Sequence, residues 1–265
     1  MTWLFALTVA GYAVASALLL VVAWQGQETL RPTLSRAAAT AFLVGFLAQT
    51  TDIGVACMRG LNPLATARDA VGAMAWLLGG LCLFVWRRQR LTILASLLVP
   101  LMLVLYAVAR LSPADQAPRV GSLLGSIHIL FALLGVALFA VAAGSAILYL
   151  ISERAIRQHR AGRQGRQPGT SLEALDRLNR RAIGFGFPVF SIALVSGAMW
   201  LAQLREPGRH VLQLLLSGGA WLIFAALLVT RLVAGIRGRR SAQFTLAGFA
   251  TALAALLVYI VQGAR

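Results

Sequence analysis

The sequence contains no lysine, and only eight of its residues are acidic. Charged residues make up 12% of its 265 residues, well below the quarter typical of soluble domains, whereas hydrophobic residues make up 59%. The mean hydropathy is +0.80. So few polar side chains cannot cover the core of a soluble protein of this length. The composition therefore excludes an ordinary soluble domain and predicts a protein whose solvent is the lipid bilayer.

Cysteine is also scarce, with only Cys57 and Cys82 present. Neither belongs to a C-x-x-C or C-x-x-C-H motif, which excludes a thioredoxin-like redox protein and a c-type cytochrome. We expect the two thiols near opposite ends of successive helices, too far apart for a disulfide, whose Cα atoms lie within about 7 Å. Both are interpreted as apolar packing residues.

The basic residues are all arginines, and the net charge is +16. A nucleic-acid-binding protein needs a continuous basic face for the phosphate backbone. Here the arginines lie in short segments between apolar runs, which is typical of a signal for membrane topology. We therefore expect the lipid bilayer, and no nucleic acid, as a partner.

Eight apolar stretches approach or exceed the roughly 20 residues that cross a bilayer as a helix. This predicts an all-α, polytopic transmembrane helical bundle that forms a single membrane domain over residues 1–265. No basic segment precedes the first stretch, so we expect a spanning helix there and no cleavable signal peptide. The predicted spans are 3–24, 37–57, 67–86, 92–109, 122–151, 183–204, 211–232 and 242–262.

Alternate connecting segments carry most of the arginines, and the positive-inside rule makes these segments cytoplasmic and places both termini outside. The longest is 152–182. Within it, Thr170 and Glu173 predict a capping box, and leucines at helical spacing predict an amphipathic helix that lies on the membrane and leads into the sixth span. The segment is interpreted either as a solvated anchor on anionic lipid or as a docking site for a partner. The arginine-rich segments contain Arg31 and Arg36; Arg87, Arg88 and Arg90; the run from Arg154 to Arg181; and Arg237, Arg239 and Arg240.

Two histidines fall at the outer side of the predicted bundle. His128 lies on the order of 10 Å inside the fifth span, and His210 lies in the loop before the seventh. Neutral imidazole is a common metal ligand and an axial ligand of haem, so two histidines on different helices could hold one iron from opposite faces. The alternatives are a hydrogen bond from His128 to a neighbouring helix and a solvated His210.

Charged residues gather at the same rim. Arginine pairs bidentately with carboxylates, so these side chains could bind haem propionates; the alternative is an ordinary interfacial position. Asp52 lies inside the second span and needs a partner, for which Arg59 and Arg68 are the nearest candidates. Asp69 begins the third span, where a negative charge suits a helix N-terminus. The candidate propionate-binding residues are Arg59, Arg68, Arg205 and Arg209.

Tryptophans of the third and sixth spans complete the candidate site. Trp76 and Trp200 either belong to the aromatic belts of the bilayer interfaces or form walls of a haem slot. The sequence leaves both interpretations open.

Several short motifs resemble those of the CcsA/ResC/HemX-type cytochrome c assembly proteins, in the same order. The stretch from Ser126-Ile-His128 to Glu153-Arg154 resembles the family's histidine-bearing helix. Ser196-Gly197-Ala-Met-Trp200 is similar to its SGxxW motif, and Arg237-Gly-Arg-Arg240 to the RGRR before the last span. The segments Gly60–Trp76 and Ser171–Leu178 also resemble family segments.

The resemblance implies a multi-pass protein of a bacterial inner membrane that binds or handles haem, as haem b, during cytochrome c biogenesis, with cytochrome c maturation proteins as partners. It implies that His128 is the haem-associated histidine of the membrane and that His210 lies near the haem. The family's tryptophan-rich WxWDxKE-like segment is missing between Trp200 and Trp221. We therefore expect a short, HemX-like accessory protein and not a synthetase. The alternatives are a membrane interaction or regulatory subunit without cofactor and a small-solute transporter.

Overall fold

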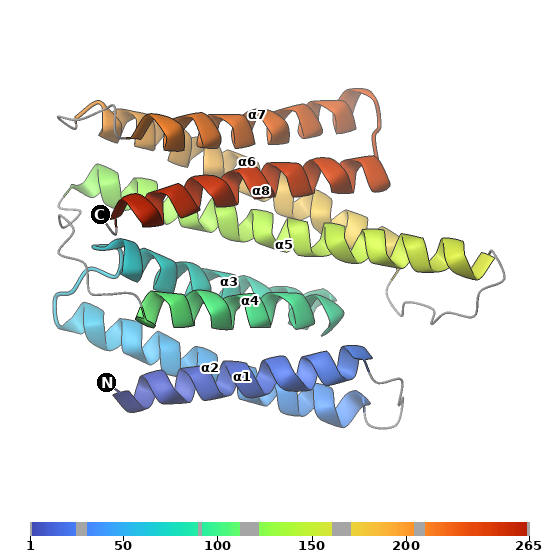
Figure 1. Cartoon of the computed structure of the whole chain (residues 1–265), viewed down its shortest axis with the longest axis horizontal. Helices are drawn as coiled ribbons and strands as arrows, with labels where there is room; N and C mark the ends of the chain where they lie inside the picture. Colours follow the sequence, from blue (N-terminus) through green and yellow to red (C-terminus); the bar gives the residue numbers. More distant parts are fainter. Residues whose placement is uncertain are drawn as a thin grey trace. The chain divides into compact units, whose positions relative to one another are not determined.

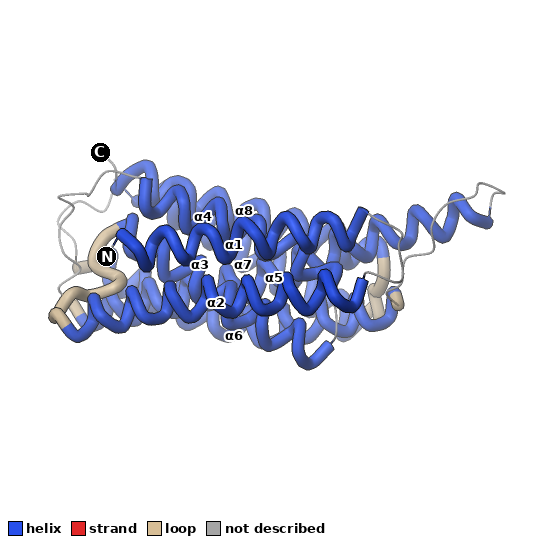
Figure 2. The backbone as a smooth tube through the Cα atoms, turned by 90° about the horizontal axis from the view of Figure 1, so that it is seen from below, coloured by secondary structure: helices blue, strands red, loops and turns tan. Residues whose placement is uncertain are grey.

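The computed structural model describes residues 2–24, 31–89, 92–111, 122–160, 171–203 and 210–263. Across these ranges the chain forms eight α-helices and no strand, joined where described by short loops (Figure 2). Each helix contains a stretch long and apolar enough to cross a membrane. This confirms the predicted all-α transmembrane architecture. The helices are α1 (Thr2–Trp24), α2 (Arg31–Met58), α3 (Ala67–Gln89), α4 (Thr92–Leu111), α5 (Leu123–Arg160), α6 (Leu172–Leu201), α7 (Val211–Val233) and α8 (Arg239–Gly263).

Several helices continue beyond the apolar stretches that predicted them. The second begins at Arg31 and not at residue 37, and the fifth continues to Arg160. Apolar composition marks the part of a helix that suits lipid, whereas the helix itself ends where its backbone hydrogen bonds stop. Figure 1 shows α5 continuing past the neighbouring ends of α7 and α8.

The start of α6 differs from the prediction for segment 152–182. Leu172, Leu175 and Leu178 belong to the first turns of α6 itself, and Leu175 and Leu178 are buried. They pack within the protein, so a continuous helix replaces the predicted separate helix on the membrane surface. The N-cap is Ser171, whose hydroxyl accepts a hydrogen bond from the N–H of Ala174 at 3.0 Å. The predicted cap, Thr170, lies outside the described residues.

Contacts divide the chain into two compact units, Met1–Gly121 and Ser122–Gly263. In the first unit, α1 packs on α2 and on α4, and α3 packs on α4. The backbones of α1 and α2 approach closely at Gly11. A Cβ atom built there would lie only 2.8 Å from the backbone of Gly45 and from the carbonyl oxygen of Ala41. Small residues at such crossings let two helix backbones approach in a membrane protein.

In the second unit, α5 packs along α6 and against α8, and α7 packs on α8. Its core contains Phe139, which stacks on Phe224 of α7 at 3.8 Å between ring centroids and meets Phe190 of α6 edge-on at 5.4 Å. Successive helices run in opposite directions, so the start of α5, the end of α6 and the start of α7 lie at the same end of this unit (Figure 1).

Candidate functional site

His128 is the sixth residue of α5, and its half-buried side chain faces α6. Its Nδ1 atom lies 2.7 Å from the carbonyl oxygen of Ala193 on α6. A carbonyl oxygen can only accept, so Nδ1 carries the proton and donates. This fixes the tautomer of the neutral ring and leaves the lone pair on Nε2 as the possible metal ligand. The neighbouring-helix hydrogen bond is therefore present, and it is compatible with ligation because the two functions use different nitrogens.

Two further residues of α6 lie against this ring. The Trp200 ring centroid is 5.9 Å from that of His128, with the planes tilted by 39°. Gly197 presents no side chain to the imidazole, and a Cβ atom built there would lie 2.5 Å from Cε1 of His128. Trp200 therefore lies beside the histidine, and its role as a wall of a haem slot stays a prediction.

His210 lies at the N-cap of α7, at the same end of the second unit as the start of α5 (Figure 1). Its side chain is half-buried and makes no capping hydrogen bond to the helix. The imidazole nitrogens of His210 therefore form no capping hydrogen bond with the backbone of α7. Its role as a second iron ligand stays a prediction. Arg205 and Arg209, predicted to bind propionates, lie outside the described residues.

The intramembrane carboxylate of the first unit has a partner that the sequence did not predict. Asp52, which is 5% exposed, forms an ion pair with Arg110 at the end of α4. The guanidinium of Arg110 also lies over the ring of Tyr106, 5.5 Å from its centroid. Asp52 was expected to pair with Arg59 or Arg68, because these are nearer in sequence; the helix packing instead provides Arg110. Asp52 is thus part of a link between α2 and α4.

Trp76 also lies in the first unit, where its indole N–H donates to the hydroxyl of Thr50 at 2.9 Å and its ring stacks on Phe46 at 6.2 Å. The hydrogen bond satisfies the polar atom of a tryptophan within a span. These contacts account for Trp76 as a packing residue between α2 and α3. Its role beside a haem stays a prediction.

Asp69 has the local role that its position predicted. The hydroxyl of Thr66 donates to its carboxylate at 2.7 Å and accepts from its backbone N–H at 3.1 Å. This reciprocal pair caps the N-terminus of α3. Arg68 is half-buried in the same turn, and Arg59 is exposed just beyond α2. Both stay predicted propionate-binding residues.

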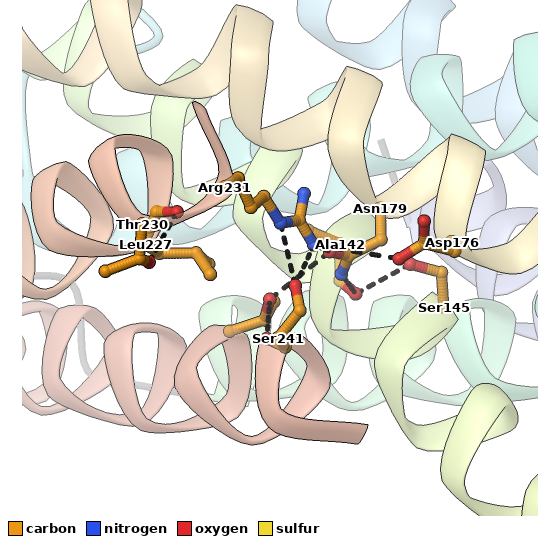
Figure 3. A network of polar contacts seen from close by, with 9 residues as sticks. Ala142, Ser145, Asp176, Asn179, Leu227, Thr230, Arg231 and Ser241 are labelled. Carbon is orange, nitrogen blue, oxygen red and sulfur yellow. Dashed lines mark hydrogen bonds and ion pairs between the residues drawn. The ribbon is translucent and has the colours of Figure 1, made fainter. Parts of the chain in front are cut away.

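A polar network in the second unit joins four helices around Arg231 of α7 (Figure 3). The Arg231 side chain is only 9% exposed, and its Nε and Nη2 atoms donate to the hydroxyl of Ser241 on α8. Nη2 also donates to Oδ1 of Asn179 on α6 at 2.5 Å, and Asp176 lies 3.9 Å away. Asn179 in turn donates to the carbonyl oxygen of Ala142 on α5 at 2.8 Å. Buried charge inside lipid is costly and is held here by hydrogen bonds from neighbouring helices.

The sequence did not predict this network, and the reason lies in where the sixth span was expected to begin. The predicted sixth span begins at residue 183, so Asn179 falls outside the predicted spans, in the stretch expected to form an amphipathic helix on the membrane. The periodicity of Leu172, Leu175 and Leu178 predicts a helix here, but it does not show that this helix continues as α6 and that Asn179 is buried.

Comparison with known proteins supports the resemblance carried by these motifs. Residues 64–263 match the family model described as "Cytochrome C assembly protein". Similar relatives include the cytochrome c biogenesis protein CcsA of Guillardia theta, which is 26% identical over 217 residues and covers 72% of this chain and 70% of the relative.

Two further relatives carry the same name. The CcsA protein of Chlamydomonas reinhardtii is 27% identical over 206 residues, covering 72% of this chain and 56% of the relative. That of Gloeobacter violaceus is 35% identical over 83 residues, covering 29% of this chain and 23% of the relative. The chain thus spans little more than half of the Chlamydomonas relative. No solved structure matches. Because the family model covers α3 to α8, the chain belongs to the cytochrome c assembly protein family.

Proposed function

We propose that this membrane protein binds or handles haem, as haem b, in cytochrome c biogenesis, and that Nε2 of His128 is an axial ligand of the iron. The observation that carries the proposal is the hydrogen bond between Nδ1 of His128 and the carbonyl of Ala193, at 2.7 Å. Metal-ligating histidines typically donate their second ring N–H to a carbonyl or carboxylate, which orients the ring and raises the basicity of the ligating nitrogen. Membership of the family and the names of its relatives support the same function.

The residues at this end of the second unit fit such a group. Haem iron accepts axial imidazole nitrogen, and His128 presents a neutral ring with one nitrogen already committed. Trp200 provides an aromatic surface beside it. The described residues contain no group of three or more histidines, cysteines or acids that could bind a bare metal ion, whereas a haem brings four nitrogen ligands of its own.

The rest of the proposed site follows from the sequence. His210 would be the second axial ligand, and Arg205 and Arg209 would bind the propionates. Arg59, Arg68 and Trp76, which belong to the first unit, stay further haem-contact candidates from the sequence alone. Asp52 and Asp69 would act indirectly, by holding α2, α4 and the start of α3. The bound haem would itself be the group that is delivered to a cytochrome. The protein would orient it and shield it from water.

The proposed setting is a bacterial inner membrane, with both termini outside and cytochrome c maturation proteins as partners. The arginine distribution supports this orientation. Since the tryptophan-rich segment of the larger relatives is missing, we propose an accessory role in haem handling and no synthetase activity.

An absorption spectrum of the detergent-purified protein, with and without added haem, tests the proposal. The wild-type protein should show a Soret band, and His128→Ala should lose it or lower the affinity for haem at least about tenfold. His210→Ala should keep the band but shift it, because one of two axial ligands is replaced. His159→Ala is the matched control, because this third histidine lies at the opposite end of α5 from His128, and it should bind like wild type. An unchanged Soret band in His128→Ala would remove the assignment of this ligand.

A further inference from the structure

Ser196, Gly197 and Trp200 lie on one face of α6, three, four and seven positions after Ala193. Residues at these spacings share a helix face. Each either contacts His128 or shares its hydrogen-bond acceptor. Ser196, Gly197 and Trp200 belong to the SGxxW motif, in which the proposed haem site uses only the tryptophan and gives Ser196 and Gly197 no role.

We propose that this histidine-contact face, formed by Ala193, Ser196, Gly197 and Trp200, positions the imidazole of His128 and tunes its hydrogen bond. The consequences for haem rest on the proposed function. The placement of the ring does not, because it is a property of the protein alone.

Gly197 provides the space for the ring. A Cβ atom at this position would lie 2.5 Å from Cε1, 2.6 Å from Nδ1 and 3.3 Å from Nε2 of His128. Real carbon atoms do not approach ring atoms that closely, so even alanine must displace the imidazole. The displacement acts on Nδ1 and therefore on its bond to Ala193. Glycine is thus required here by the neighbouring side chain and not by its own backbone conformation.

Ser196 shares the acceptor of His128. Its hydroxyl lies 2.8 Å from the carbonyl oxygen of Ile192 and 3.1 Å from that of Ala193, and it donates to both. The Ala193 carbonyl therefore accepts from Ser196 and from Nδ1 of His128. Two donors on one oxygen weaken each other's bonds. Removing the hydroxyl should strengthen the Nδ1–H bond, give the imidazole more anionic character and stabilise ferric over ferrous iron in a bound haem.

Trp200 borders the ring on another side, with 5.9 Å between centroids. A broad apolar ring here limits the rotation of the imidazole about its χ2 bond. The carbonyl, the glycine and the tryptophan thus together restrict His128 to one orientation, which presents Nε2 for ligation.

The placement of the ring can be measured without haem by nitrogen-15 NMR of labelled imidazoles in the apoprotein. The chain has only three histidines, and His128→Ala assigns the signal. Wild type should show the Nδ1–H tautomer at His128. Gly197→Ala should give a mixture of tautomers and lower the affinity for haem about tenfold. The matched control is Gly184→Ala, on the same helix, where an added Cβ meets no atom within 4 Å.

A second variant keeps the proposal testable if Gly197→Ala does not fold. Ser196→Ala should move the Nδ1 proton of His128 downfield in the apoprotein, and should lower the reduction potential of the haem-loaded protein. Wild-type NMR signals in both variants would overturn the proposal. If the variants change the NMR signals but wild type takes up no haem, the positioning role stands and the proposed haem function fails.

Discussion

Arg231 is a charged residue inside a segment that is apolar enough to cross a membrane. Its donors on Nε and Nη2 are used by Ser241 and Asn179, whereas Nη1 is buried and has no hydrogen-bond partner among the described residues. With Asp176 3.9 Å away, the charge is only partly compensated. The buried guanidinium of Arg231 is therefore stabilised mainly by its hydrogen bonds to Ser241 and Asn179. Asn179 is the residue that connects it to α5.

We expect Asn179→Ala to destabilise the protein by about 2 kcal/mol, because it removes one of two side-chain hydrogen bonds to the carbonyl of Ala142 and leaves one donor of Arg231 unsatisfied in a buried site. Thermal unfolding in detergent measures the change. Asn62→Ala is a matched control, since Asn62 is exposed and its side chain accepts a turn hydrogen bond from the N–H of Leu64. Equal melting temperatures for the two variants would contradict a stabilising network.

At the scale of elements, α6 begins in a polar segment and continues into a span without interruption. Its first turn is stabilised by Ser171, whose hydroxyl accepts from the N–H of Ala174 at 3.0 Å. Glu173 favours the same turn through the helix dipole and pairs with Arg177 one turn later, at 3.4 Å. Because the Glu173 side chain is 83% exposed and that of Arg177 is 43% exposed, their ion pair contributes little. The cap is therefore the main local determinant of where α6 starts.

We expect Ser171→Ala to weaken the first turn of α6 by about 1 kcal/mol, the usual cost of losing a side-chain cap. Hydrogen exchange at the amides of residues 172–176 should accelerate, while exchange further along α6 stays unchanged. Thr170→Ala is the control, because the cap lies at Ser171. Faster exchange in Thr170→Ala and not in Ser171→Ala would restore the cap predicted from the sequence.

At the scale of the whole molecule, the eight candidate spans of the described residues predict that both termini lie on one side of the membrane, and the arginine-rich segments predict which side. The two native cysteines offer a test, because Cys57 is exposed near the end of α2 and Cys82 is buried. Cys57 would face outward, whereas the extension of α5 that includes Gln158 would face the cytoplasm.

A membrane-impermeant maleimide should label Cys57 in intact cells of the Cys82→Ser variant. In a background in which both cysteines are replaced by serine, Gln158→Cys should be labelled only after the membrane is permeabilised, because Gln158 is exposed and the arginine distribution predicts that it lies on the cytoplasmic side. The reverse pattern would invert the topology. It would also place His128 at the cytoplasmic end of its helix.

Local chemistry accounts for the features that the sequence predicted well. Asp69 and Thr66, three positions apart, cap the N-terminus of α3, so the role of Asp69 could be predicted without knowledge of the tertiary structure. The partner of Asp52 could not be predicted this way, because Arg110 is distant in sequence and is brought near only when the first unit packs. The start of α6 fell between these cases, since Thr170 and Ser171 can both cap and the sequence alone does not choose between them.

The sequence by itself determined the membrane as solvent, the eight helices and the family, because hydropathy, helix length and short motifs are properties of contiguous residues. Only the tertiary structure decided which nitrogen of His128 is committed, which carbonyl accepts its proton and why position 197 is glycine. These depend on α6 lying against α5 with one particular face. That contact joins residues some 65 positions apart, and its register is set by the packing of whole helices.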